Sequence, residues 1–229
     1  RGMSEHHLVN DRTYSLGETW RFLTRLPSGR RISLAASFQA FVGYGLGAWI
    51  PAFFIRLHGM TTGELGLWLS WIIGIGGALG AFFGGWLADK WTTRQPKART
   101  SISLIGALLS IPFIIAALII EDTTLALLSL FPANIFGTMW LGPAGSIVQD
   151  LAPPAMRATA SAVFIFILTM IGLGAGPQTV GILNDMIGTP DAIRYSLLWV
   201  AVSTSLISAV FFWLTGKTLE QDIQAKQQL

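Results

Sequence analysis

The chain has 229 residues, of which 52% are hydrophobic and only 12% are charged, and its net charge is +3, whereas about a quarter of the residues are charged in an ordinary soluble domain. Its apolar residues form long blocks without the alternation of half-buried strands, so the composition excludes a soluble domain and an outer-membrane barrel and predicts an all-α membrane protein. The absence of cysteine excludes a disulfide framework and a thiolate metal site.

Residues 1–31 form a polar segment that we interpret as a cytoplasmic linker. Ser15 and Glu18 have the spacing of a helix capping box. Apolar residues then recur near helical spacing, at Leu16, Trp20, Leu23 and Leu26. The pattern ends at Pro27 and predicts a short amphipathic helix, which lies either in the headgroup layer of the membrane or in solvent.

The first residue is Arg1 rather than methionine, and the start of the chain lacks the charged and apolar regions of a signal peptide. We therefore expect the sequence to be part of a longer protein. The adjacent His6 and His7 are expected to be solvated rather than to bind a metal. No cofactor or metal site is expected elsewhere.

Six apolar blocks follow, and each has about the 20 residues that a helix needs to cross the hydrocarbon core. They cover residues 32–55, 65–87, 101–120, 125–148, 159–183 and 195–214. None contains lysine, arginine, aspartate or glutamate, as expected when a charge at mid-bilayer costs about 2.5 kcal/mol or more. We predict a six-helix bundle over residues 32–215 and a cytoplasmic tail over residues 216–229.

Lysine and arginine are distributed unevenly between the two sides of this bundle. Thirteen fall in the terminal segments and in the loops on their side, and two, Arg56 and Arg194, fall on the other side. Because positively charged loops stay in the cytoplasm, we predict an integral protein of the cell inner (plasma) membrane with both termini cytoplasmic and with loops 56–64 and 184–194 outside. The same distribution argues against nucleic-acid binding, which needs basic residues on one solvated face.

Glycines follow helical spacing in two spans. Gly76, Gly80 and Gly84 share one face of the second span, and Gly172 and Gly176 share a face of the fifth. Small residues at this spacing allow helices to pack closely in lipid, and we prefer that interpretation to a gating role. Prolines also lie within the spans, at Pro112, Pro132, Pro143 and Pro177. They free backbone carbonyls, so some of them are expected to line a cavity.

Residues that channel or enzyme chemistry needs are missing from the spans. A water channel needs paired Asn-Pro-Ala caps, whereas residues 132–134 have the order Pro-Ala-Asn and have no second copy. An intramembrane serine protease needs a buried base, but no span contains histidine, and the His-Glu-x-x-His pattern of a metalloprotease is absent. We therefore expect no catalytic residue and no enzyme activity.

A basic loop signature lies between the second and third spans, in the run GWLADKWTTR at residues 85–94. Its residues Gly85, Asp89, Lys90 and Arg94 resemble the signature of the major facilitator superfamily, in which Gly-x-Leu-Ala-Asp-Arg leads into a basic loop. In that family both halves carry the signature and the second copy is weaker, and Thr92 stands here where the stronger copy has glycine. The resemblance implies the carboxy-terminal half, helices seven to twelve of a twelve-helix bundle.

Further runs are similar to members of this family. The run PPAMRATAS at residues 153–161 places Arg157 where they carry a Pro-x-x-x-Arg-x-x-Ala pattern. Several short runs also look like the spinster-like branch, namely Phe41 with residues 49–51, residues 174–181 with Asp185, and residues 194–198. Membership of that branch implies a small amphipathic or lipid-like substrate.

The resemblance also implies a mechanism and a partner. Two six-helix halves rock about a substrate site near the midplane, so this chain needs an amino-terminal six-helix half as its partner. Candidate residues of the cavity wall are Phe41, Tyr44, Asn134, Thr138, Trp140 and Gln178. For the aromatic residues lipid contact or packing is the competing interpretation, whereas Asn134 and Gln178 are better candidates because a buried amide needs partners.

Asp89 lies at the cytoplasmic end of the second span, where the family pattern implies that it docks against the positive amino end of a helix in the other half and so holds the cytoplasmic side closed. The competing interpretation is that it is solvated or pairs locally with Lys90 or Arg94. No carboxylate or histidine lies within a span, so any proton site would belong to the other half. An alternative to the half-transporter is a complete six-helix protein that acts as an oligomeric scaffold or small channel.

Overall fold

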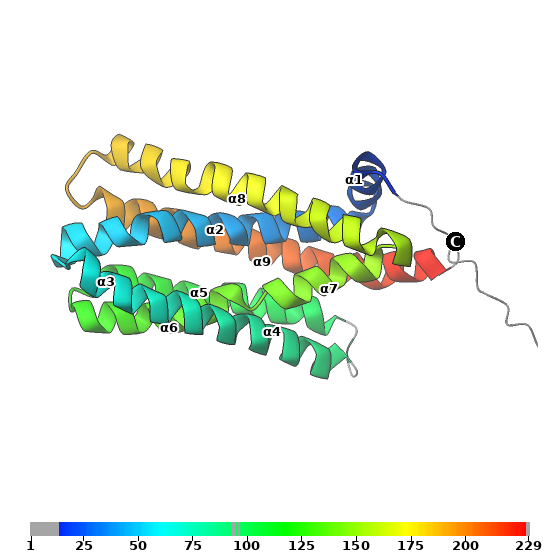
Figure 1. Cartoon of the computed structure of the whole chain (residues 1–229), viewed down its shortest axis with the longest axis horizontal. Coiled ribbons are helices and arrows are strands. Elements are labelled where there is room, and N and C mark those ends of the chain that lie inside the picture. Colours follow the sequence, from blue (N-terminus) through cyan, green and yellow to red (C-terminus); the bar gives the residue numbers. More distant parts are fainter. Residues whose placement is uncertain (1–13, 93–94, 96, 228–229) are drawn as a thin grey trace, which may run out of the picture.

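The computed structural model describes residues 14–92, 95 and 97–227 and folds them into helices, with no strand in these ranges. The helices run roughly along one direction, and both ends of the described chain lie at the same end of the bundle (Figure 1). We call this the terminal end and the opposite one the distal end. Arg94, His6 and His7 lie outside the described residues.

The described helices are α1 (Leu16–Arg25), α2 (Pro27–His58), α3 (Thr62–Leu69), the π-helix η1 (Ser70–Gly76), α4 (Gly77–Thr92), α5 (Ala98–Ile119), α6 (Thr123–Thr138), α7 (Leu141–Leu151), the 3-10 helix η2 (Pro154–Met156), α8 (Arg157–Ile187) and α9 (Ala192–Gln227). In this part of the chain, six helical segments are long and apolar enough to cross a membrane. Each corresponds to one predicted span, so the prediction of six membrane helices is confirmed. The second span combines α3, η1 and α4, and the fourth combines α6 and α7.

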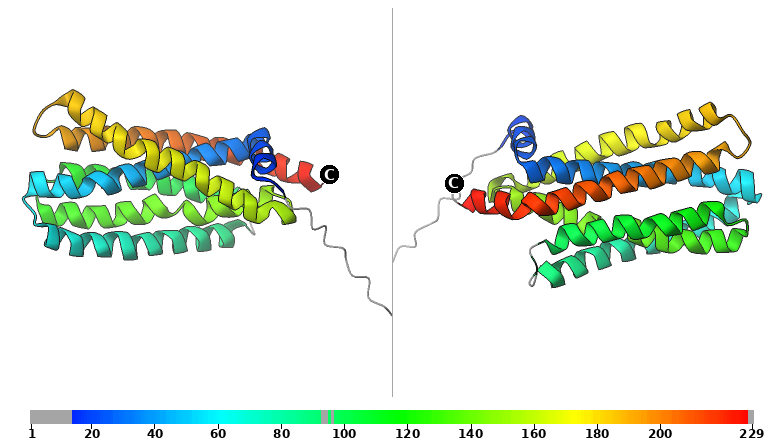
Figure 2. Two further views of the ribbon diagram at one scale, coloured as in Figure 1. Left: turned by 45° about the horizontal axis from the view of Figure 1, so that its top comes forward. Right: turned by 180° about the vertical axis from the view of Figure 1, so that it is seen from behind.

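Two groups of helices make up the bundle. Helices α2, α8 and α9 pack against one another, and so do α4, α5 and α6. Figure 2 shows the two groups side by side, and extensive contact between α5 and α9 joins them. Buried apolar side chains form one cluster around Ile32, Ile147 and Phe212 at the terminal end and another around Phe53, Phe54 and Leu127 at the distal end.

Helix α1 covers the segment before the first span for which the sequence predicts a short helix. The Ser15 hydroxyl accepts a hydrogen bond from the Glu18 amide (3.2 Å), and the Glu18 carboxylate accepts one from the Ser15 amide (2.9 Å). Leu23 is buried in the core cluster of the terminal end, whereas Leu16 and Trp20 stay exposed. The helix therefore packs on α2 and α8 and presents apolar side chains outward.

Helices α2 and α9 are longer than the first and sixth predicted spans, to which they correspond. Helix α2 begins at Pro27, a residue well suited to the first position of a helix. The Ser28 amide just after it donates to the Asp222 carboxylate of α9 (2.8 Å), and Arg31 donates to the Thr218 hydroxyl (3.0 Å). Side chains of α9 thus bond to the first turn of α2. The two helices therefore stay packed beyond their apolar blocks, through polar residues.

The fourth span is interrupted rather than continuous. Helix α6 ends at Thr138 and α7 begins at Leu141, which places Pro143 in the first turn of α7. Proline has no amide hydrogen to donate to the carbonyl four residues earlier, and it is tolerated in a first turn, where that hydrogen bond is not needed. The predicted span over residues 125–148 is therefore one membrane-crossing segment, Thr123–Leu151, whose helix is interrupted between Thr138 and Leu141.

Close packing of the glycine faces is confirmed. A Cβ atom on Gly80 would lie 2.1 Å from the Ile135 carbonyl oxygen, and one on Gly84 would lie 2.0 Å from the Met139 carbonyl oxygen. In the fifth span, a Cβ atom on Gly176 would lie 2.7 Å from the Phe41 carbonyl oxygen. Glycine therefore sets the distance between the second and fourth spans and between α8 and α2.

Candidate functional site

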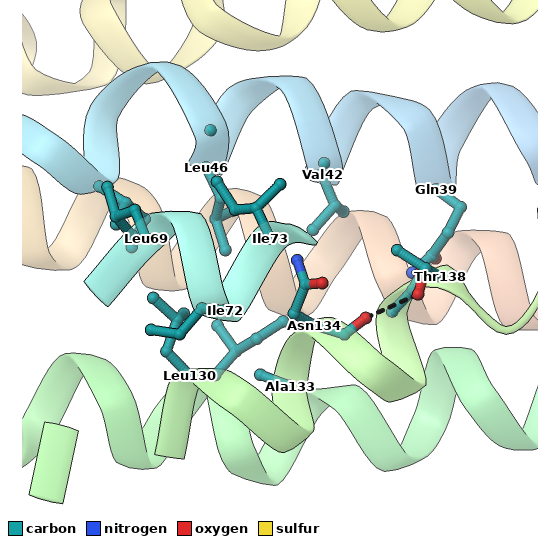
Figure 3. Close-up of a pocket in the computed structure, with 15 residues that line it drawn as sticks. Gln39, Val42, Leu46, Leu69, Ile72, Ile73, Leu130, Ala133, Asn134 and Thr138 are labelled. Carbon is teal, nitrogen blue, oxygen red and sulfur yellow. Dashed lines mark hydrogen bonds between the residues drawn. The ribbon is translucent and has the colours of Figure 1, made fainter. Parts of the chain in front are cut away.

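A cavity of about 230 Å³ lies between α2, the second span and α6. Its wall is mostly aliphatic, with a few polar groups from α2 and α6 (Figure 3). The lining residues are Gln39, Val42, Gly43, Leu46, Gly47, Ile50, Leu69, Ile72, Ile73, Ile114, Leu130, Ala133, Asn134, Gly137 and Thr138. Because Gly43, Gly47 and Ile73 are exposed, the cavity opens on the surface of the bundle.

Two amide side chains lie in opposite walls of the cavity, one on α2 and one on α6. Gln39 is only 3% exposed, and its Nε2 donates to the Gly137 carbonyl at 3.4 Å. Asn134 points from α6 toward α2 (Figure 3). The buried oxygens Oε1 of Gln39 and Oδ1 of Asn134 have no hydrogen-bond partner among the described residues. Two acceptors in the cavity wall therefore lack a hydrogen bond within the described chain.

Thr138 is the third polar residue of the wall. Its hydroxyl lies 2.9 Å from the Asn134 carbonyl oxygen, the contact drawn as a dashed line in Figure 3, and 3.3 Å from the Gly77 carbonyl oxygen. The hydroxyl has one hydrogen to donate. That hydrogen goes to the nearest oxygen, within α6, so the hydroxyl packs against the second span next to Asn134 and retains lone pairs that can accept.

The π-helical segment η1 shapes the wall opposite α2. It interrupts the second span at residues 70–76, and its Ile72 and Ile73 line the cavity. Its last residue, Gly76, lies so close to α6 that an added Cβ atom would be 3.4 Å from the Asn134 Oδ1. Single π-turns inside α-helices occur frequently at functional sites, and here the turn lies directly against the unpaired amide.

The predicted cavity residues do not all lie together. Asn134 and Thr138 line the cavity, whereas Phe41, Tyr44, Trp140 and Gln178 do not. Trp140 is 5% exposed and packs in the core cluster of the terminal end.

Two of the other candidates are exposed on the surface of the bundle. Tyr44 is 38% exposed beside α8, and Gln178 is exposed on α8. Gln178 is therefore not the buried amide that the sequence suggested. The sequence argument missed Gln39, although the signal was present, since Gln39 is the single amide of an otherwise apolar first span.

The loop signature lies at the terminal end of α4. Asp89 and Lys90 are exposed in its last turns, and the Lys90 ammonium lies 4.9 Å from the centre of the Trp86 ring. Asp89 has no ion pair within the described residues. Gly85 contacts the fourth span, because a Cβ atom on Gly142 would lie 3.2 Å from its Cα. Arg157, the first residue of α8, is exposed at the same end.

An ion pair between Arg99 and Asp150 lies at the terminal end of the bundle. It joins the start of α5 to the last turn of α7, and both side chains are partly exposed. Sequence reasoning did not find this pair. The available signal was one basic and one acidic residue at the ends of two antiparallel neighbouring spans.

Comparison with known proteins places the chain in a family. The family model of the Major Facilitator Superfamily matches residues 5–177. An MFS-type efflux pump of Mycolicibacterium smegmatis is 34% identical over 208 residues, which cover 89% of this chain and 48% of the pump. Protein spinster homolog 3 of Danio rerio is 26% identical, and the match covers 100% of this chain and 50% of that protein.

Solved structures show the same likeness. The crystal structure of a bacterial homolog to the human lysosomal transporter Spinster, in an inward-facing and occupied conformation, matches with a TM-score of 0.79 and 26% identity. The match covers 87% of this chain and 51% of the other. An inward-facing and unoccupied form also gives 0.79, at 25% identity. The chain thus spans about half the length of the relatives it matches.

Proposed function

This chain belongs to the major facilitator superfamily and is spinster-like in sequence and fold, and we propose that it forms one half of a secondary transporter that works by alternating access. Its relatives are about twice as long, which supports a second six-helix half as its partner. The weaker loop signature around Thr92 supports the carboxy-terminal position for this half. The partner is then an amino-terminal half of the same transporter.

The cavity between α2, η1 and α6 is the observation that carries the proposal. It opens on the bundle surface, and two buried amide oxygens in its wall have no partner among the described residues. An unpaired buried polar group costs free energy, so such groups are retained where a ligand or another conformation satisfies them. In our proposal the cavity becomes part of the substrate site when the other half covers it.

The composition of the wall favours a small amphipathic substrate. Aliphatic residues from four of the membrane segments surround only three polar side chains, those of Gln39, Asn134 and Thr138. Pockets of this kind bury the apolar surface of a ligand against their aliphatic wall and orient the ligand through a few polar contacts. We therefore propose a lipid-like molecule whose donor group meets the amides.

Phe41, Tyr44 and Gln178 are proposed to contribute from beside this cavity. Tyr44 and Gln178 are exposed on neighbouring helices of the bundle, where the other half can reach them. Trp140 is proposed only to support the site by packing, because it is buried in the core.

Asp89 is proposed as a latch at the cytoplasmic side. Its carboxylate is exposed, and no ion pair holds it within the described residues, which supports docking on the amino end of a helix in the other half. The proposal includes an inner-membrane location with both termini cytoplasmic. The thirteen basic residues on the terminal side support this orientation.

Substitution of the two amides in the full-length transporter tests the substrate site. Asn134→Leu and Gln39→Leu remove the acceptors but keep similar volumes. Each is expected to lower transport of a fluorescent lysophospholipid about two- to tenfold, the equivalent of one lost hydrogen bond. Gln149→Leu, which changes an exposed amide at the end of α7, is the matched control. If all three variants transport like the parent at equal expression, the cavity is not the substrate site.

A further inference from the structure

A second cavity, of about 240 Å³, lies between α5 and α9 near the terminal end. It is distinct from the cavity described above, because it shares none of its residues. The lining residues are Lys97, Thr100, Ser101, Leu104, Phe212, Trp213, Gly216 and Lys217. One side of it is therefore basic and polar, and the other is apolar and aromatic.

Two lysines from different parts of the chain line this cavity. Lys97 is the N-cap of α5, which has no side-chain capping bond, and Lys217 lies on α9 with its Nζ 3.3 Å from the centre of the Trp213 ring. Neither lysine pairs with a carboxylate within the described residues, and Glu220 makes no ion pair with Lys217 although it lies one turn further along α9. The two positive charges are therefore not neutralised by a described residue of this chain.

Helices α5 and α9 come very close beside this cavity. Gly216 is buried, and a Cβ atom there would lie 2.8 Å from the Thr100 hydroxyl oxygen. The Thr100 and Ser101 hydroxyls both lie within 3.0 Å of the Lys97 carbonyl oxygen and donate to it. Both hydroxyl hydrogens are therefore used within the chain, which leaves the two lysines as the charged donors of the cavity.

The position of the cavity matches the boundary between lipid tails and headgroups. The apolar block of the third span begins at Ser101, and that of the sixth ends at Leu214. Leu104 and the 52% exposed Trp213 lie on the apolar side of this boundary, whereas both lysines lie on the polar side. Tryptophan is enriched at this depth, and lysine stems extend toward the headgroups.

We propose that this cavity, the Lys97–Lys217 site, binds the headgroup of an anionic phospholipid. The phosphate lies between the two ammonium groups, and one acyl chain runs along Leu104 and Trp213. Basic pockets between membrane helices are suited to acidic headgroups, since each nearby lysine contributes attraction to them. The acyl contacts distinguish a lipid from a free phosphate ion, which has nothing to place against the aromatic floor.

Native mass spectrometry of the purified full-length protein tests this site. The protein is mixed with phosphatidylglycerol or with phosphatidylcholine of the same acyl chains. We expect selective retention of phosphatidylglycerol, and about a 25-fold weaker affinity for it in Lys97→Gln/Lys217→Gln, roughly fivefold for each lysine. The conservative Lys97→Arg/Lys217→Arg variant is expected to retain the lipid because it keeps both charges.

Lys90→Gln is the matched control, since Lys90 is an exposed lysine of the same end but lies outside the cavity. It is expected to bind phosphatidylglycerol like the parent. An excess of inorganic phosphate is expected not to displace the lipid. The site is refuted by equal binding of the two lipids, by an equal loss in Lys90→Gln, by loss in the arginine variant, or by full displacement with phosphate.

Discussion

Gln39 and Asn134 are buried amides whose oxygens face a cavity without a partner in the described chain. Leaving such a group unpaired costs about 1–3 kcal/mol, so packing of this half alone does not explain why the amides are there. In the proposed transporter, a substrate donor supplies the missing hydrogen bond. The two residues are thus the strongest individual link between the structure and transport.

Asp89→Asn is the residue-scale test of the cytoplasmic latch. The change removes the charge but keeps the shape, so membrane expression and thermal stability should stay close to those of the parent. An interaction of a carboxylate with a helix amino end is worth about 0.3–1 kcal/mol, or up to about 2 kcal/mol when partly buried. We expect lower transport in the full-length protein and higher reactivity of a cysteine at position 146 with a cytoplasmic thiol reagent.

The partly buried Ser146 is a suitable reporter because it lies on α7, beside the end of α4 that carries Asp89. Lys90→Gln serves as the control, since it changes the neighbouring charge in the same turn. If labelling at position 146 is the same in Asp89→Asn as in the parent, Asp89 has only a local role in its loop.

Some site residues could be predicted from the sequence, and the reason is their chemistry. Asn134 stands out as an amide inside an apolar block, and the structure places it in the cavity wall. The same argument applies to Gln39, which was overlooked, whereas Gln178 is exposed on α8 and not buried. The sequence shows that an amide lies in a span, but the direction in which it points depends on helix rotation and neighbours.

At the scale of elements, glycine determines how closely the second and fourth spans approach. Gly80→Ala would bring a Cβ atom to within 2.1 Å of both the Ile135 carbonyl oxygen and the Thr138 hydroxyl oxygen. Because the first of these is backbone, the helices must separate. We expect a loss of about 1–3 kcal/mol in stability, as for other overpacked sites, measured as a lower melting temperature in detergent.

Gly66→Ala is the matched control on the same span. Gly66 has no atom within 4 Å of the added Cβ, and alanine favours helix more than glycine does. Its melting temperature should equal or exceed that of the parent. Equal melting of Gly80→Ala and Gly66→Ala would mean that the close approach of the two spans contributes nothing to stability.

Helix boundaries were only partly predictable. Apolar blocks predicted the number of spans, but α2 and α9 continue into polar segments because side chains of α9 bond to the start of α2, as the Asp222 carboxylate does to the Ser28 amide. The π-helical segment η1 carries no local sequence mark beyond its glycines. It depends on contact with α6, which a single-sequence argument does not contain.

At the scale of the whole molecule, the uneven distribution of basic residues predicts the orientation. Single cysteines at Thr62 and Thr189 should react with an impermeant thiol reagent in intact cells, whereas one at Gln95 should not. All three positions are exposed, and the absence of native cysteine leaves no background. Thr62 is preferred to the neighbouring Gly59, whose positive φ of 66° disfavours a side chain. The opposite labelling pattern would reverse the proposed topology.

The bundle has the form of one half of its longer relatives, and its cavity opens on its own surface. A single wall cannot alternate access to a substrate, and no carboxylate or histidine lies within its predicted spans to couple a proton. A complete six-helix channel or scaffold, in contrast, needs only copies of itself. The two accounts therefore differ in whether a second, different half is required.

Reconstitution into liposomes measures this difference most directly. Uptake of a fluorescent lysophospholipid is followed with the 229-residue chain alone and with the chain co-expressed with the amino-terminal half of a matching transporter. We expect no uptake above that of protein-free liposomes for the chain alone, and substrate-saturable uptake for the pair that Asn134→Leu reduces. Saturable uptake by the chain alone would contradict the half-transporter account.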